Sequence, residues 1–107
     1  MESQMKRGVL EMCLLWVIAS EETYGYHLLK KMSNTFPGLQ ERTAYAILQR
    51  LLNNGYTETF SQEVSAGPPR KYYRITNVGK QYLLASIKDW VLLTQSVEKL
   101  GIQSLDS

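Results

Sequence analysis

The chain has 107 residues, a formal net charge of +2, 44% hydrophobic residues and 21% charged residues. This predicts one small globular domain, because a disordered chain would be less hydrophobic and two independent cores would need more residues. The longest uncharged run near the start, residues 12–20, is shorter than the about 20 residues that cross a bilayer, and glutamates flank it. We therefore expect no membrane span, no signal peptide and a cytoplasmic location.

The sequence offers little for catalysis or metal binding. It has one cysteine, Cys13, and one histidine, His27. A single cysteine excludes an internal disulfide and a multi-cysteine zinc site, and a thiol in an apolar segment is more often inert than reactive. Paired carboxylates at a useful spacing and glycine-rich phosphate loops are absent. We expect no enzyme activity, no cofactor and no metal.

Positive charge is concentrated in the middle of the chain. Residues 23–80 carry eight basic and three acidic side chains, a net of +5, against −2 for residues 1–22 and −1 for residues 81–107. A basic central segment is one signature of a polyanion-binding surface. The alternative is an ordinary solvated surface.

The first predicted helix, residues 5–19, is apolar on two faces. One face carries Leu10, Leu14 and Val17, and the other carries Met5, Val9, Met12 and Trp16. A helix with two apolar faces needs two partners, and a domain this small covers only one of them. The pattern favours a dimer, and the alternative is a helix enclosed by its own domain.

The next two predicted helices cover residues 24–35 and 41–54. The first directs Leu28, Leu29 and Met32 inward and ends before a Pro-Gly pair at residues 37–38. In the second, one face has the i, i+3, i+4, i+7 spacing of a buried stripe: Ala44, Ile47, Leu48 and Leu51. The other face is polar and acid-free after Glu41: Arg42, Thr43, Tyr45, Ala46, Gln49, Arg50 and Asn53. Such a face suits phosphates and base edges, although many short helices carry an ordinary polar face.

A hairpin is predicted over residues 57–64 and 70–76, with Ser-Ala-Gly-Pro-Pro as its turn. Tyr73 and Ile75 are expected to face inward, and Tyr72 and Arg74 outward. Arg70 and Lys71 follow the tip, which is typical of a finger that contacts a sugar–phosphate backbone. A solvated hairpin without a partner is the alternative.

The last predicted helix covers residues 77–100 and would be about 35 Å long. Five residues spaced 4, 3, 4 and 3 form a heptad seam: Leu83, Ile87, Trp90, Thr94 and Val97. Such a seam is typical of a helix that packs along another helix. Because this helix extends past the body of a small domain, we expect its free end to pack against another subunit. Residues 101–107 are expected to be a frayed tail.

Helix, helix, helix, two-stranded wing, helix is the order of a winged helix-turn-helix, an α+β fold that is mainly α. In that fold the third helix enters the major groove and the wing contacts the backbone beside it. Three segments give the sequence a family resemblance: YGYHL at residues 24–28, TAYAILQRLLNNGY at 43–56 and GPPRKYYRITNVG at 67–79. With these segments the chain resembles the PadR-like transcriptional regulators over residues 5–100. Its single long C-terminal helix is similar to that of the short subgroup.

The resemblance implies a homodimeric DNA-binding regulator, usually a repressor, that binds an inverted repeat upstream of its own or a neighbouring efflux or detoxification gene. It implies a winged helix over residues 1–76, in which the first helix also joins the dimer interface, and a dimerisation helix over residues 77–100. By position, the residues expected at DNA are Tyr24, Tyr26, Arg42, Thr43, Tyr45, Gln49, Arg50, Arg70, Lys71 and Tyr72.

Trp90 matches a tryptophan that some drug-sensing members place opposite its own copy, where the pair encloses a flat ligand. A small planar aromatic or cationic effector is therefore expected, with stacking and cation–π contributions. The residues assigned to the interface or to this ligand pore are Val9, Met12, Trp16, Leu83, Ile87, Trp90, Thr94 and Val97. Simple packing of the two tryptophans in a closed dimer core is the alternative. A winged-helix module that binds protein or RNA is the alternative function.

Overall fold

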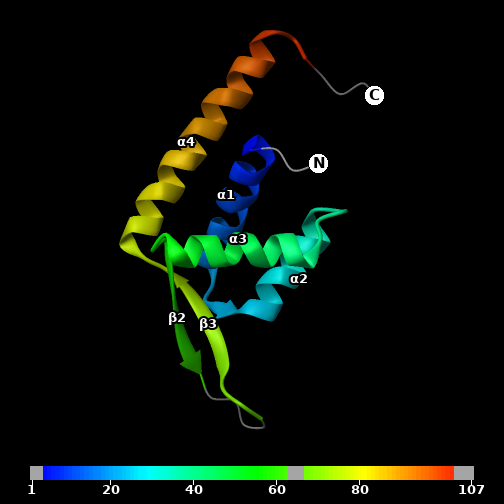
Figure 1. The fold of residues 1–107 in the computed structure, drawn as a ribbon. Helices are drawn as coiled ribbons and strands as arrows, with labels where there is room; N and C mark the ends of the chain where they lie inside the picture. Colours follow the sequence, from blue (N-terminus) through cyan, green and yellow to red (C-terminus); the bar gives the residue numbers. More distant parts are fainter. Residues whose placement is uncertain (1–3, 63–66, 103–107) are drawn as a thin grey trace.

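The computed structural model describes residues 4–62 and 67–102. The chain order is α1 (Gln4–Ser20), β1 (Thr23–Tyr24), α2 (Gly25–Thr35), α3 (Glu41–Asn53), β2 (Thr57–Gln62), β3 (Arg70–Ile75) and α4 (Asn77–Lys99) (Figure 1). The predicted mainly α, winged-helix order is confirmed, and the ends of the helices differ from the prediction by one residue at most. Residues 63–66, which end the predicted first strand and begin the predicted turn, and residues 103–107 of the predicted tail lie outside the described residues.

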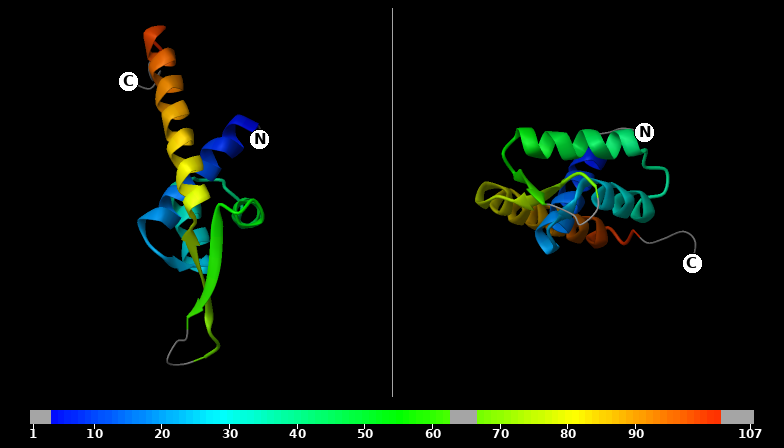
Figure 2. Two further views of the ribbon diagram at one scale, coloured as in Figure 1. Left: turned by 90° about the vertical axis from the view of Figure 1, so that its left-hand side faces the viewer. Right: turned by 90° about the horizontal axis from the view of Figure 1, so that it is seen from below.

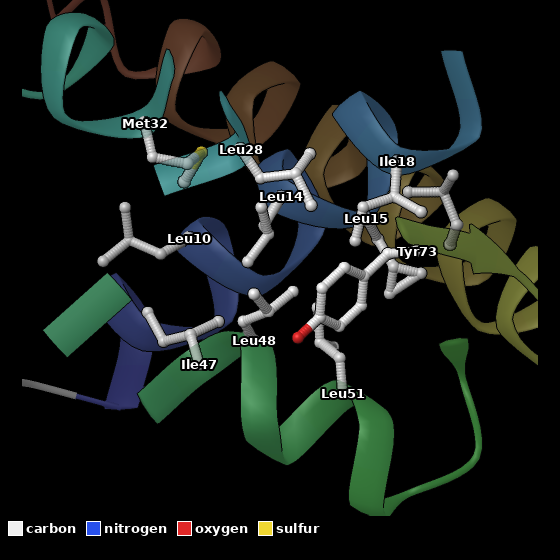
Figure 3. Close-up of a cluster of buried hydrophobic side chains, with 11 residues drawn as sticks. Leu10, Leu14, Leu15, Ile18, Leu28, Met32, Ile47, Leu48, Leu51 and Tyr73 are labelled. Atoms are coloured by element: carbon white, nitrogen blue, oxygen red, sulfur yellow. The ribbon is translucent and has the colours of Figure 1, made fainter. Parts of the chain in front are cut away.

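The core is built around α1. Its buried residues pack against leucines and a methionine of α2 and α3 and against Tyr73 of β3 (Figure 3). The predicted buried face of α3 is confirmed, whereas that of α1 includes Leu15 and Ile18 and leaves Val17 only partly buried. Burial of each such side chain contributes about 1.5–3 kcal/mol. The fully buried large side chains are Leu10, Leu14, Leu15, Ile18, Leu28, Met32, Leu48 and Leu51.

The wing is a three-stranded antiparallel sheet in the order β1-β3-β2. Tyr24 and Phe60 both pair with Tyr72, so these three rings lie in one row across the sheet. Tyr73 points to the opposite face and enters the core, as predicted. The sequence did not predict β1, because a strand of two residues has no alternation to recognise.

The start of α4 is fixed to the turn between α3 and β2. The Thr76 hydroxyl accepts from the Gly79 amide at 3.0 Å and donates to the Gly55 carbonyl at 2.7 Å. The Thr76 amide donates to the Tyr56 carbonyl at 3.0 Å. A Cβ at position 79 would collide with that carbonyl oxygen, so only glycine allows this approach. The first turn of α4 is therefore anchored to the winged-helix body.

Beyond this anchor, α4 lies beside α1 and then continues past it (Figures 1 and 2). The prediction that the heptad seam packs against a partner subunit is therefore wrong for its first two residues. Leu83 is 5% exposed and Ile87 packs against the same core, because the first turns of α4 cover α1. Other large apolar side chains are exposed: Leu84 in the first half of α4, and farther along Trp90, Val91, Leu92, Leu93, Val97 and Leu100.

Candidate nucleic-acid interface

The outer surface of α3 presents polar side chains opposite its buried leucines. Arg42, Tyr45 and Ala46 are exposed, and Thr43 and Gln49 are partly exposed. The Gln49 amide nitrogen donates to the Tyr45 hydroxyl at 2.8 Å, so these two side chains lie together along the helix. We call this surface, Arg42, Thr43, Tyr45, Ala46 and Gln49, the α3 face. It offers a guanidinium, a phenol, a hydroxyl and an amide, which are groups that bind phosphates and base edges.

Arg50 forms an ion pair that the sequence did not predict. It was expected to project from the same surface, and its Nη1 lies 3.0 Å from Glu11 Oε2 on α1. The arginine side chain is 38% exposed and the glutamate side chain only 11%. The reason is electrostatic, because a carboxylate at this depth needs a cation or donor and Arg50 supplies both. Sequence reasoning missed Glu11, although an acid between Leu10 and Leu14 in an apolar helix was a usable signal.

Cations lie over the row of aromatic rings on the outer face of the wing. The Arg70 guanidinium lies 4.4 Å from the centre of the Tyr24 ring, and the Arg74 guanidinium lies 4.1 Å from that of Phe60. Tyr72 lies between, with ring centres 5.7 Å from Tyr24 and 5.6 Å from Phe60. Each cation–π contact at an exposed site contributes about 0.5–1 kcal/mol, so the rings hold the guanidinium groups in place without neutralising them.

A hollow forms where the start of α2 meets the start of β3. It measures about 490 Å³ and is lined by Tyr24, Gly25, Tyr26, Arg70, Lys71 and Tyr73, and we call it the wing hollow. Two groups of residues that sequence reasoning assigned separately, Tyr24 with Tyr26 and Arg70 with Lys71, thus line one concave surface. Along β3, strand alternation directs Lys71 to the face of the sheet opposite Arg70 and Tyr72. The two cations therefore leave the sheet on different faces, although both line the wing hollow.

Nearby acids are paired with bases of the same region. Glu58 lies 3.4 Å from Arg74, and Glu21 lies 3.4 Å from His27 and 3.7 Å from Lys31. Burial raises the pKa of Tyr73, and the charge of Tyr45 adds to the rise. The wing hollow combines tyrosine hydroxyls with two cations, a donor set that suits an anionic backbone.

A second hollow separates α1 from α4. It measures about 230 Å³ and is lined by Val9, Met12, Tyr82, Ser86, Asp89, Trp90 and Leu93, and we call it the α1/α4 groove. Trp90, predicted for a ligand pore, is 41% exposed there. Trp16 is 58% exposed but is not one of the lining residues, and Thr94 and Val97 lie farther along α4.

The described residues offer little for metal binding, for thiol chemistry or for crossing a membrane. No group of three metal-binding side chains occurs within residues 4–62 and 67–102. Burial raises the pKa of the Cys13 thiol, which disfavours the reactive thiolate. Over the same residues, no helix is both long enough and apolar enough to cross a membrane.

A helix with an exposed polar face, a helix that supports it and an adjacent cationic wing define a winged helix-turn-helix protein. Residues 14–85 match the family described as "Transcriptional regulator PadR-like family". The chain belongs to this family, as its motifs predicted. It is therefore a DNA-binding transcriptional regulator and not an enzyme.

Related proteins are similar over nearly their whole length. An uncharacterized protein of Lysinibacillus sphaericus is 35% identical over 99 residues, which cover 90% of this chain and 91% of that protein. The crystal structure of a Streptococcus transcriptional regulator is 31% identical with a TM-score of 0.84, and the match covers 94% of this chain and 100% of that one. The PadR-like transcriptional regulator of Bacillus cereus is 36% identical with a TM-score of 0.82, over 95% of this chain and 100% of that one.

Proposed function

We propose that the protein is a homodimeric repressor that binds an inverted repeat upstream of its own gene or of a neighbouring efflux or detoxification gene. The observation that carries the DNA part is the wing hollow, where Arg70, Lys71, Tyr24 and Tyr26 converge. The α3 face supplies groups for base edges, and the wing hollow supplies cations for phosphates. In this arrangement α3 lies in the major groove and the wing follows the adjacent backbone.

A second copy of the chain is proposed to cover the far half of α4. Trp90, Leu93, Val97 and Leu100 are exposed there, and single exposed hydrophobics are common whereas a contiguous set marks an interface. The set adjoins the α1/α4 groove, because Trp90 and Leu93 also line that groove. Two copies related by a two-fold axis would present two α3 faces to one side of a duplex, about 34–36 Å apart.

Release of DNA is proposed to follow binding of a planar aromatic cation in the α1/α4 groove. Trp90 offers a ring for stacking, and the Asp89 carboxylate lines the same groove. Together they favour a flat ligand with a positive charge. If Trp90 instead packs against its own copy, the groove is closed in the dimer and planar dyes will not quench its fluorescence.

The test of the proposed function is a titration with two duplexes. One covers the region upstream of the chain's own gene, and the other has the same base composition in shuffled order. We expect the first to bind roughly 10³–10⁷-fold more tightly, with an affinity that falls steeply with salt. Equal binding of both duplexes, or none, would contradict operator recognition and favour a protein- or RNA-binding module.

A further inference from the structure

We propose that Glu11 couples the α1/α4 groove to the recognition helix, because its carboxylate is shared by Tyr82 of α4 and Arg50 of α3. The inference rests on the proposed function, since it assigns a path between the groove and the DNA-binding surface. Glu11 acts here as a positioning residue. Glu11 is not part of the groove lining. It touches Tyr82, which lines the groove, and Arg50, which belongs to α3.

The two oxygens of Glu11 have partners on two different helices. Oε2 accepts from Arg50 Nη1 at 3.0 Å, and Oε1 accepts from the Tyr82 hydroxyl at 3.2 Å. The glutamate side chain is only 11% exposed. A carboxylate at this depth that loses a partner is left with an unmet hydrogen-bonding requirement, so water does not simply replace either bond. A displacement of Tyr82 therefore changes the position or the charge balance of Glu11, and Arg50 responds.

Tyr82 is the residue where the groove and the core meet. It lines the α1/α4 groove together with Met12 and Trp90. Its ring also stacks on Tyr56, with centres 4.2 Å apart and planes 10° apart. Tyr56 directly follows the C-terminal turn of α3, so Tyr82 contacts both the helix end and the Glu11–Arg50 pair. An occupant of the groove that pushes on Tyr82 acts on α3 through two contacts.

The anchoring of α4 directs this motion. Thr76 and Gly79 hold the first turn of α4 against Gly55 and Tyr56. The far half of the helix has no such attachment in the described chain, and its apolar side chains are exposed. A ligand that separates α4 from α1 must therefore pivot the helix about its first turn. Tyr82 lies one turn beyond the pivot, so it is displaced without unfolding of the anchor.

The experiment measures how strongly binding of a dye to the protein changes its affinity for DNA. The probe is rhodamine 6G, a planar aromatic cation, and the DNA is the upstream duplex. The coupling factor is the ratio of the duplex Kd with saturating dye to the Kd without it, and couplings of this kind are roughly 5–150-fold. We expect such a factor for the unmodified dimer and a clearly smaller one for Glu11→Gln and Tyr82→Phe, which lose the Glu11 contact but keep the stacked ring of residue 82. Tyr56→Phe, which keeps the stacked ring, and Glu22→Gln, an exposed glutamate, are the matched controls and should retain the coupling.

A second readout needs no DNA. In protein with ¹³C-labelled tyrosine, the dye should shift the Tyr45 ring signal of the unmodified chain, and this shift should be clearly smaller in Glu11→Gln. If both Glu11 and Tyr82 variants remain folded by circular dichroism and keep full coupling, the inference is wrong although the proposed function stands. If the upstream duplex is not preferred, the proposed function fails, and the Tyr45 signal still decides the inference. An unmodified chain in which neither Tyr45 nor the DNA affinity responds to the dye also overturns it.

Discussion

Arg50 on α3 and Glu11 on α1 form an ion pair with a separation of 3.0 Å, which links α3 to the helix around which the core is built. Helix periodicity assigned Arg50 to the polar face of α3, and the ion pair adds a contact between its guanidinium and α1 that periodicity does not show. It also gives the buried carboxylate a role in orienting α3. Arg42, the other arginine of α3, is exposed.

The first prediction concerns the stability of that pair. Arg50→Ala should lower the free energy of unfolding by about 1–3 kcal/mol, because it leaves Glu11 with one partner fewer in a mostly buried site. Thermal or urea denaturation at one fixed protomer concentration measures the change, since stability of a dimer depends on concentration. Arg42→Ala, an exposed arginine on the same helix, is the control and should stay within about 0.5 kcal/mol. Equal stability of the two variants would contradict the role given to the pair.

The second prediction separates phosphate contacts from base contacts in the wing. Lys71→Ala should weaken binding to the upstream and shuffled duplexes alike, because a phosphate contact carries no sequence information. The slope of log K against log salt should become shallower by about 0.9 for each phosphate that the lysine no longer neutralises. Fluorescence anisotropy over a salt series measures it. Lys88→Ala, an exposed lysine on α4, should leave the slope unchanged, and an unchanged slope for Lys71→Ala would remove the wing from the phosphate backbone.

The third prediction tests the α3 face. Tyr45→Ala removes the phenol that accepts from Gln49 and should reduce affinity for the upstream duplex by about 1–3 kcal/mol, the usual value of a base contact. Binding to the shuffled duplex should change little, so the preference between duplexes narrows. Competition titrations of both duplexes measure this. Gln81→Ala, exposed on α4, serves as the control, and equal weakening for both duplexes would contradict a role of Tyr45 in base recognition.

Sequence periodicity predicted the helices and the wing because each carries a repeat of its own. The stripe of Ala44, Ile47, Leu48 and Leu51 identified the buried face of α3, and Gly55, with φ of +78°, marked the turn after it. The Tyr24 and Arg70 groups could be named from the sequence, but that they share one hollow depends on β1, which is too short to show alternation.

The interface assignment of Leu83 and Ile87 failed, and the Glu11–Arg50 pair was not predicted, because both depend on contacts between elements that are distant in the sequence. Leu83 and Ile87 fit a heptad as well as Trp90 does, and only the position of α1 beside the start of α4 places the first two in the core. In the same way, no local pattern connects Arg50 with Glu11, because these residues are 39 positions apart.

The fourth prediction concerns alkaline pH. Burial raises the pKa of Tyr82, and the charge and hydrogen bond of Glu11 raise it further above the usual value of about 10. A phenol whose pKa is raised by folding stabilises the folded state fully below its unfolded pKa and loses this contribution as the pH rises through the folded pKa. The free energy of unfolding should therefore fall between about pH 9 and about pH 11, and less so in Tyr82→Phe. Urea denaturation at both pH values measures it, with Tyr26→Phe, an exposed tyrosine, as the control that should keep the full decrease.

The fifth prediction distinguishes the two halves of α4. Val97→Asp places a charge on the exposed half and should shift the dimer toward monomers, because a carboxylate buried in an apolar interface is costly without a partner. The monomer should keep its fold and lose most of its affinity for the upstream duplex, since one α3 face replaces two. Leu83→Ala should act oppositely: it should cost about 2–5 kcal/mol of stability through a core cavity and leave the association of the folded chains intact. Light scattering across a concentration series, beside denaturation curves, separates these effects. A Val97→Asp chain that remains dimeric would place the interface elsewhere on the molecule.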